Sequence, residues 1–184
     1  RGGQGTVLLA KMIADAVLRA GRGECMAIPE FGVERRGAPV LAYTRVCDKP
    51  IHVRTRIYEP DAVVVLDTAF AAGPAVTIGL KKGGTIVLNT EETPAALAAR
   101  FPDFQTRAVC AKRIALAHKL GSATSPVVNT AMCGAVCAVF GLSDLACLEI
   151  SIREAVPVKH DENVAAAREA FLLCSKETKA HAAA

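Results

Sequence analysis

The sequence predicts an α/β fold: a three-layer sandwich with a mostly parallel central sheet, a β-hairpin insertion and a helical C-terminal part. Residues 61–67 and 84–89 are short apolar runs that each end in a polar residue, as buried parallel strands do. Helix-like and strand-like segments alternate up to residue 125, after which the pattern is helical. A chain of 184 residues has the size of one domain, so we expect a single domain over residues 1–184.

The first part of the chain is expected to contain a helix, a short strand and a hairpin. Apolar residues recur at helical spacing over residues 5–20, with charged residues on the opposite side and Gly21 at the end. A short strand follows over residues 24–28. Residues 39–46 and 51–56 alternate around Cys47-Asp48-Lys49-Pro50, which predicts a hairpin whose cationic face carries His52, Arg54 and Arg56.

The later elements are expected from periodicity and from residues that start or stop helices. Thr90 precedes a helix over residues 92–100, and a strand over 106–110 leads to a helix over 112–120. Three further helices are expected over residues 127–140, 143–155 and 161–179, with Gly141 as a stop and Ser143 as a cap.

Composition argues against several classes of protein. The formal net charge is +4 and basic residues are interleaved with acidic ones, so we expect no nucleic-acid binding. No apolar run reaches the ~18 residues that span a bilayer, and no signal-peptide pattern is present, so we expect no membrane contact and a cytoplasmic location. Apolar residues make up 52% of this small chain, which indicates faces reserved for partner proteins.

The cysteines and histidines form no pattern typical of a reactive or metal site. The seven cysteines are scattered and include no Cys-x-x-Cys, so we expect reduced core residues and no metal site. No histidine pairs with a nucleophile and no two carboxylates are spaced for acid–base chemistry. We therefore expect no catalytic residue in this chain.

A glycine-rich turn, Arg1-Gly2-Gly3-Gln4-Gly5, leads directly into the first predicted helix. Such a turn lets the backbone approach a ligand closely, and the helix N-terminus suits a phosphate. The third glycine of a dinucleotide fingerprint is replaced by Leu8, and the lysine of a P-loop is missing after Gly5. The turn is therefore either a phosphate site or a tight strand-to-helix connection.

A second candidate is the charged cluster Glu34-Arg35-Arg36-Gly37, which lies within the string Phe31 to Pro39. Guanidinium groups suit phosphate or carboxylate, whereas the alternative interpretation is a solvated turn. Asp67 and Asn89 end two of the predicted strands, so with the glycine turn they are expected at the carboxyl edge of the sheet, where α/β proteins bind ligands.

Three strings together resemble the gamma subunit of 2-oxoacid:ferredoxin oxidoreductases of the pyruvate, 2-ketoisovalerate or 2-oxoglutarate type. They are the glycine turn, the Phe31 to Pro39 string and Ile57-Tyr-Glu-Pro-Asp-Ala-Val-Val-Val-Leu-Asp67. Asn129, Gly134 and Phe140-Gly-Leu142 extend the resemblance over nearly the whole chain.

The resemblance implies a subunit of an enzyme that oxidatively decarboxylates a 2-oxoacid to an acyl-CoA and CO₂ while reducing ferredoxin. In that family thiamine diphosphate lies between the alpha and beta subunits, and the iron–sulfur clusters sit in the beta and delta subunits. The gamma subunit holds neither, so this chain is not expected to be catalytic alone. Neither the 2-oxoacid nor the subunit stoichiometry follows from the sequence.

The family role implied for this chain is assembly and the coenzyme A side of the reaction. The candidate contacts to coenzyme A or to neighbouring subunits are Gly2, Gly3, Gln4, Gly5, Glu34, Arg35, Arg36 and Gly37. Members of the family have a strand before the glycine turn, and this sequence begins at Arg1 without one. Either the end has been trimmed, or the sheet lacks a first strand that would lie at its centre. The alternatives are a stand-alone nucleotide- or phosphate-binding α/β protein and a purely structural scaffold subunit.

Overall fold

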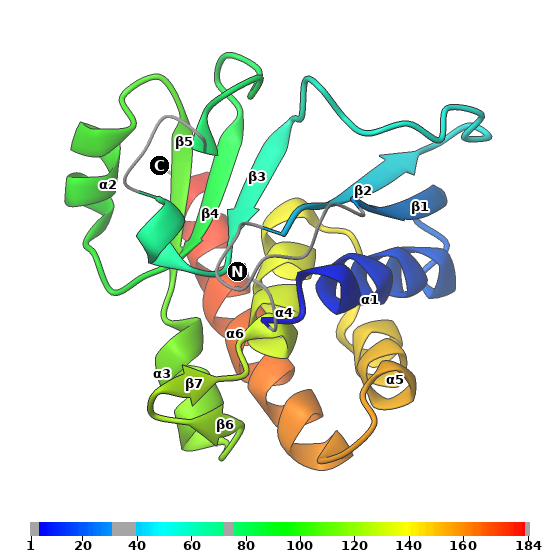
Figure 1. Cartoon of the computed structure of the whole chain (residues 1–184), viewed down its shortest axis with the longest axis vertical. Helices are drawn as coiled ribbons and strands as arrows, with labels where there is room; N and C mark the ends of the chain where they lie inside the picture. The colour runs from blue at the N-terminus through cyan, green and yellow to red at the C-terminus, as the bar shows by residue number, and fades with distance from the viewer. Residues whose placement is uncertain (1–3, 31–39, 72–75, 183–184) are drawn as a thin grey trace.

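The computed structural model describes residues 4–30, 40–71 and 76–182, with side chains as far as residue 176 (Figure 1). The helices are α1 (Thr6–Arg19), the 3₁₀ helix η1 (Thr68–Phe70), α2 (Pro94–Arg100), α3 (Ala111–Ala117), α4 (Asn129–Phe140), α5 (Leu145–Ala155) and α6 (His160–Ala182). The strands are β1 (Glu24–Pro29), β2 (Ala42–Cys47), β3 (Ala62–Val65), β4 (Thr85–Asn89), β5 (Gln105–Val109), β6 (Gly121–Ser122) and β7 (Ser125–Pro126).

The central sheet is parallel, with the strand order β3-β4-β5. Alternate residues of β4 face opposite sides, because side chains point up and down in turn along a strand. Ile86 and Leu88 join the apolar cluster that includes Leu97 of α2, whereas Val87 joins the larger cluster formed with α1, α4 and α6. Helices thus cover both faces of the sheet (Figure 1), and the predicted three-layer α/β arrangement is confirmed.

An antiparallel strand pair is present, but its partners differ from the predicted hairpin. β2 pairs with β1, from Glu24 opposite Cys47 to Pro29 opposite Ala42, and residues 51–56 form no strand. Alternation of polar and apolar residues identifies the two faces of a strand but does not identify its partner. The backbone of the 51–56 segment is instead contacted by a side chain of β2, where Arg45 Nη2 donates to Thr55 O at 3.3 Å.

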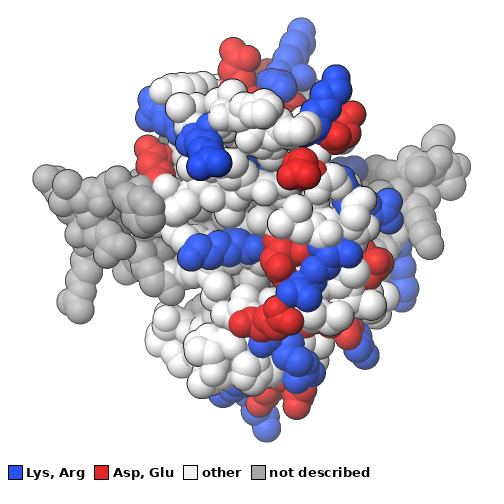
Figure 2. All heavy atoms as spheres, turned by 90° about the vertical axis from the view of Figure 1, so that its right-hand side faces the viewer, with Lys and Arg blue, Asp and Glu red and all other residues white. Residues whose placement is uncertain are grey.

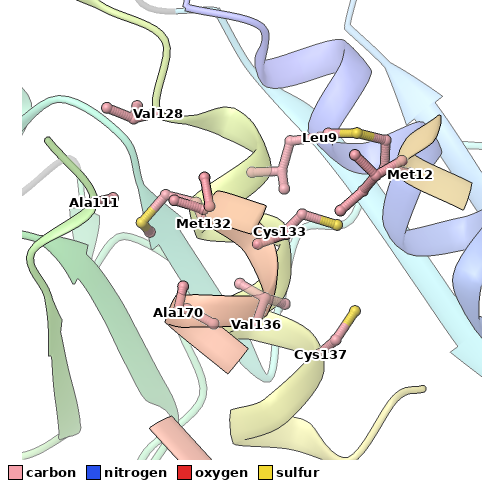
Figure 3. Close-up of a cluster of buried hydrophobic side chains, with 14 of the residues drawn as sticks. Leu9, Met12, Ala111, Val128, Met132, Cys133, Val136, Cys137 and Ala170 are labelled. Carbon is pink, nitrogen blue, oxygen red and sulfur yellow. The ribbon is translucent and has the colours of Figure 1, made fainter. Parts of the chain in front are cut away.

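Helix α4 is the centre of the larger apolar cluster. Figure 3 shows Met132, Cys133, Val136 and Cys137 of α4 between Leu9 and Met12 of α1 and Ala170 of α6. Helices α4 and α6 pack unusually closely: a Cβ atom on Gly134 would overlap the carbonyl oxygen of Ala167 and lie 2.8 Å from its carbonyl carbon. Gly141, with φ of 62°, ends α4 as predicted.

The cap of α5 lies one residue beyond the predicted position. Asp144, not Ser143, is the N-cap, and its Oδ1 accepts a hydrogen bond from Cys147 N at 2.8 Å. The Ser143 hydroxyl donates to Asp144 O instead. Both residue types are good caps, so the sequence could not choose between neighbours.

This cap predicts a contribution of Asp144 to acid stability. The hydrogen bond from the Cys147 N–H holds the pKa of Asp144 below the usual 3.8. A carboxyl with a lowered folded-state pKa stabilises the fold above the unfolded-state pKa and loses this contribution as pH falls through the folded-state pKa. We therefore expect Asp144→Asn, which keeps an acceptor but cannot titrate, to lose less stability than the parent between about pH 5 and pH 2.

Urea unfolding at a series of pH values measures this difference. Asp103→Asn is the matched control, because Asp103 is exposed and its side chain makes no hydrogen bond with any described residue. Identical pH profiles for Asp144→Asn and the parent would contradict the prediction.

Candidate functional site at the head of helix α1

The structure brings together two residues that the sequence placed at the carboxyl edge of the sheet. Gln4 Nε2 donates to Asp67 Oδ2 at 3.2 Å, across 63 residues of sequence. Asp67 also caps η1, since its Oδ1 accepts from Ala69 N at 3.0 Å. Gln4 Oε1 is buried and has no hydrogen-bond partner within the described residues. The N-terminal end of α1 is thus attached to the C-terminal end of β3.

Asn89 at the end of β4 has a structural role at the same edge. Its Nδ2 donates to Leu66 O at 2.9 Å, and its Oδ1 accepts from Lys112 N at 3.1 Å. Both ends of the amide are therefore used to join β4 to the end of β3 and the start of α3.

Gly5 adopts a left-handed conformation, with φ of 73° and ψ of 29°, at the start of α1. A Cβ atom here would lie 2.5 Å from Nδ2 of Asn129, the first residue of α4. The glycine thus allows the heads of α1 and α4 to meet. The sequence points to Asn129 only through the family resemblance, because no local spacing relates Asn129 to the glycine turn.

A second polar cluster surrounds Glu30, the residue that follows β1. Tyr43 Oη donates to Glu30 Oε2 at 2.6 Å, and Arg56 lies 3.7 Å from Glu30 Oε1 and 4.4 Å over the ring of Tyr58. Burial raises the pKa of Tyr43 to about 12, and the neighbouring Glu30 carboxylate adds to this rise. The Tyr43 hydroxyl therefore stays protonated and holds Glu30 in place.

Most of the predicted site residues cannot be placed in this geometry. Gly2, Gly3, Glu34, Arg35, Arg36 and Gly37 lie outside the described residues. Gln4 and Gly5 are described, and both lie at the head of α1.

A groove of about 490 Å³ runs between the two larger sheets. Its walls include Tyr43 and Thr44 of β2 on one side, Val63 and Val64 of β3 on the other, and Thr6 at the start of α1. Within the described residues, β2 and β3 each have one edge without a hydrogen-bonded neighbour. The groove is therefore bordered by the open edges of two strands.

The Cys133 side chain of α4 lies in an environment that disfavours a thiolate. The hydrogen bond between Cys133 and Cys137, together with burial, raises the pKa of Cys133, so its thiol stays protonated.

Among residues 4–30, 40–71 and 76–182 no three His, Cys, Asp or Glu side chains gather as metal ligands. No helix in this part of the chain is long and apolar enough to cross a membrane.

The charged side chains are mixed on the face shown in Figure 2, where acidic and basic groups alternate. Arg168 binds both carboxylate oxygens of Glu149, at 2.7 and 2.8 Å, and Arg19 pairs with Asp15 and Glu154. Much of the charge of these arginines is thus balanced locally.

Comparisons with known proteins agree over most of the chain. The family model described as pyruvate ferredoxin/flavodoxin oxidoreductase matches residues 1–173. The pyruvate/ketoisovalerate oxidoreductases common subunit gamma of Thermococcus kodakarensis is 41% identical over 176 residues, covering 93% of this chain and 91% of the relative. Pyruvate synthase subunit PorC of Methanothermobacter marburgensis is 43% identical over 172 residues, covering 93% and 92%.

Solved structures give the same result. The pyruvate oxidoreductase subunit PORC of Thermotoga maritima superposes with a TM-score of 0.76 at 30% identity, covering 94% of this chain and 91% of that one. A 2-oxoglutarate:ferredoxin oxidoreductase from Magnetococcus marinus shares the fold, with a TM-score of 0.69 at 21% identity over 97% of this chain and 30% of its own. The resemblance predicted from the sequence is confirmed: the chain belongs to the pyruvate ferredoxin/flavodoxin oxidoreductase family, in which the relatives compared above are gamma or PorC subunits.

Proposed function

We propose that this chain is the gamma subunit of a complex that oxidatively decarboxylates a 2-oxoacid to an acyl-CoA and CO₂ and reduces ferredoxin. The observation that carries this proposal is the family match over residues 1–173, supported by relatives about 40% identical over 93% of the chain. One relative is named as a subunit common to pyruvate and ketoisovalerate oxidoreductases. A subunit shared by two enzymes does not choose the 2-oxoacid, so we assign that choice to other chains.

The partners in this proposal are alpha, beta and delta subunits in the cytoplasm. Thiamine diphosphate lies between alpha and beta, and the iron–sulfur clusters belong to beta and delta.

Within the complex we assign this chain to assembly and to the coenzyme A side. The head of α1, with Gly2 to Gly5, and the cluster Glu34 to Gly37 supply the candidate contacts. The Magnetococcus marinus complex that shares this fold was solved with coenzyme A bound.

Mild affinity purification from the native cell, followed by assays, tests this function. We expect thiamine- and iron–sulfur-containing subunits to copurify, with coenzyme A-dependent 2-oxoacid oxidation by the complex and none by the isolated chain. If this chain were recovered alone, the result would contradict the gamma-subunit assignment and favour a stand-alone phosphate-binding protein.

Coenzyme A titration of the complex distinguishes a ligand site from a scaffold. The double variant Arg35→Ala/Arg36→Ala is expected to weaken binding at least tenfold, whereas Arg113→Ala, an exposed arginine on α3, serves as the control. Unchanged binding in the double variant would remove Arg35 and Arg36 from the site, and no binding to the complex would favour the scaffold role.

We further propose that the groove between β2 and β3 holds a β-strand that continues through the glycine turn into α1. The support is the groove itself, which two open strand edges border and which Thr6 of α1 lines. β2 and β3 point in opposite directions in Figure 1, and Gln4 is attached at the end of β3. A strand leading to Gln4 would run parallel to β3 and antiparallel to β2, and would join both into one mixed sheet.

Hydrogen exchange on a chain extended before Arg1 tests this strand. We would add a seven-residue segment, Lys-Val-Thr-Val-Arg-Val-Gly, and use the same segment with proline for its two central residues as the control. Slower exchange of the edge amides of β3 in the first chain alone is expected. Equal exchange in both chains would overturn the proposal.

A further inference from the structure

We propose that a cationic corner of the molecule, formed by Lys112, Arg113, Lys119 and Lys159, docks on an acidic face of another subunit of the complex. The proposal rests on the proposed function for the existence of that complex. It concerns a different surface from the glycine turn, and none of the four residues lines the groove between β2 and β3.

The positive charge of the chain is concentrated in one stretch of its sequence. Residues 104–143 contain no Asp or Glu but include Arg107, Lys112, Arg113 and Lys119. Without these four, 18 of the 22 basic residues remain, which equals the 18 acidic residues of the chain. The net charge of +4 is therefore the charge of this stretch, and the rest of the chain is balanced.

The fold brings most of this charge to one corner. α3 packs its apolar face on the core and exposes Lys112 and Arg113. Lys119 follows the end of α3, and Lys159 Nζ donates to Lys119 O at 2.5 Å across 40 residues of sequence. The fourth cation thus comes from the start of α6, which packs beside α3 (Figure 1).

The charge of the corner is not balanced within the part of the chain that the structure describes. None of its four cations forms an ion pair with a described residue, whereas Arg153 and Arg168 each pair with a carboxylate. Glu169 of α6 is already occupied by His118, whose Nε2 lies 2.8 Å from Glu169 Oε2. Glu162, in the first turn of α6, is left to oppose the four cations. The corner therefore keeps a positive charge that a partner can neutralise.

Exposed apolar side chains lie beside the cations. Val127 N donates to the carbonyl of Leu120, the residue after Lys119, and the Val127 side chain is 42% exposed. Val158, which precedes Lys159, is 64% exposed. Protein interfaces combine such apolar contacts with complementary charges that fix the orientation of the partner. A protein face rich in Asp and Glu therefore matches both features of the corner.

Other anionic partners match the corner less well. Residues 105–139 contain no aromatic side chain on which nucleic-acid bases stack. α3 has seven residues and its apolar face is buried in the core, so it has no free apolar face to enter a lipid interface. We therefore assign the corner to a protein partner.

The first experiment is carbodiimide cross-linking of the purified complex, with the linked peptides identified by mass spectrometry. A carbodiimide joins a lysine amine directly to a carboxylate with which it is in contact. We expect Lys112, Lys119 or Lys159 to be linked to an Asp or Glu of another subunit. Absence of any link from these three lysines to another chain would overturn the proposal.

Charge reversal measures the contribution of the corner to assembly. Lys112→Glu/Arg113→Glu is expected to weaken association with the other subunits at least tenfold at low salt, and the difference from the parent should shrink as salt is raised. The matched control is Lys49→Glu/Arg54→Glu, which changes the net charge equally at two exposed positions without an ion pair to a described residue. Equal weakening in both double variants would overturn the corner as the specific contact.

A milder variant keeps the test decisive if the charge-reversed chain does not fold, as judged by circular dichroism. Lys112→Gln/Arg113→Gln removes both charges without adding a carboxylate, and we expect severalfold weaker association at low salt. Unchanged association in this variant would overturn the proposal.

Copurification with the parent chain separates this proposal from the proposed function. If the parent and Lys112→Glu/Arg113→Glu assemble equally well, the proposed function stands and the corner is not the contact. If the parent joins no thiamine- or iron–sulfur-containing subunit, both the proposed function and the partner named here are overturned. If the charge reversal abolishes binding to duplex DNA or to phosphatidylserine vesicles and leaves assembly unchanged, the protein partner is overturned in favour of that anion.

Discussion

The Gly134→Ala variant is expected to be less stable than the parent by about 3 kcal/mol. The added methyl group would overlap the carbonyl oxygen of Ala167 and approach its Cα to 3.0 Å. Both neighbours are backbone atoms of α6, so no side-chain rotation can relieve the overlap, and α4 must move away from α6. Close packing between the helices would be lost along the buried face.

Helix propensity gives the opposite expectation and makes the prediction decisive. In an unconstrained helix, replacing glycine by alanine stabilises by about 1 kcal/mol. Gly141→Ala is the control for backbone effects, since a Cβ atom there meets nothing within 4 Å while φ is 62°. It should cost about 1 kcal/mol from the left-handed conformation alone. Denaturant unfolding of the three chains measures these differences, and a Gly134→Ala variant as stable as the parent would contradict the close packing of α4 and α6.

The sequence predicted the elements of this fold better than their partners. The apolar runs at 61–67 and 84–89 are the parallel strands β3 and β4, because a strand buried on both faces has a recognisable composition. The predicted hairpin was wrong in its partners. Alternation over residues 51–56 indicates which side chains are exposed, but it does not indicate which strand lies beside them. From the sequence, Gly134 is only a residue of low helix propensity. Its role becomes clear from the structure, where the backbone of α6 leaves no room for a side chain at this position.

The site was predictable where a general rule of sheet topology applies. Gln4 and Asp67 meet because the carboxyl ends of parallel strands and the following helix heads share one edge. Asn129 follows from no such rule, since it reaches Gly5 through the packing of α4 against α1, far along the chain. The exclusion of side chains at Gly5 likewise appears only in the folded chain.

The Gly5→Ala variant is the second large effect, and it should reduce the stability of the fold. The left-handed conformation at φ of 73° costs a non-glycine residue about 1 to 2 kcal/mol, and the new methyl group would lie 2.5 Å from Asn129 Nδ2. We expect a total loss of about 3 kcal/mol, because the N-terminal ends of α1 and α4 must separate.

A double-mutant cycle with Asn129→Ala separates the two causes of this loss. The overlap at Gly5 involves mainly Nδ2 and Cγ of Asn129, at 2.5 and 3.0 Å, which alanine removes. The double variant should therefore be more stable than the sum of the single losses predicts, by about 1 kcal/mol, while the cost of the left-handed backbone remains. Additive stability losses would show that the two positions do not touch.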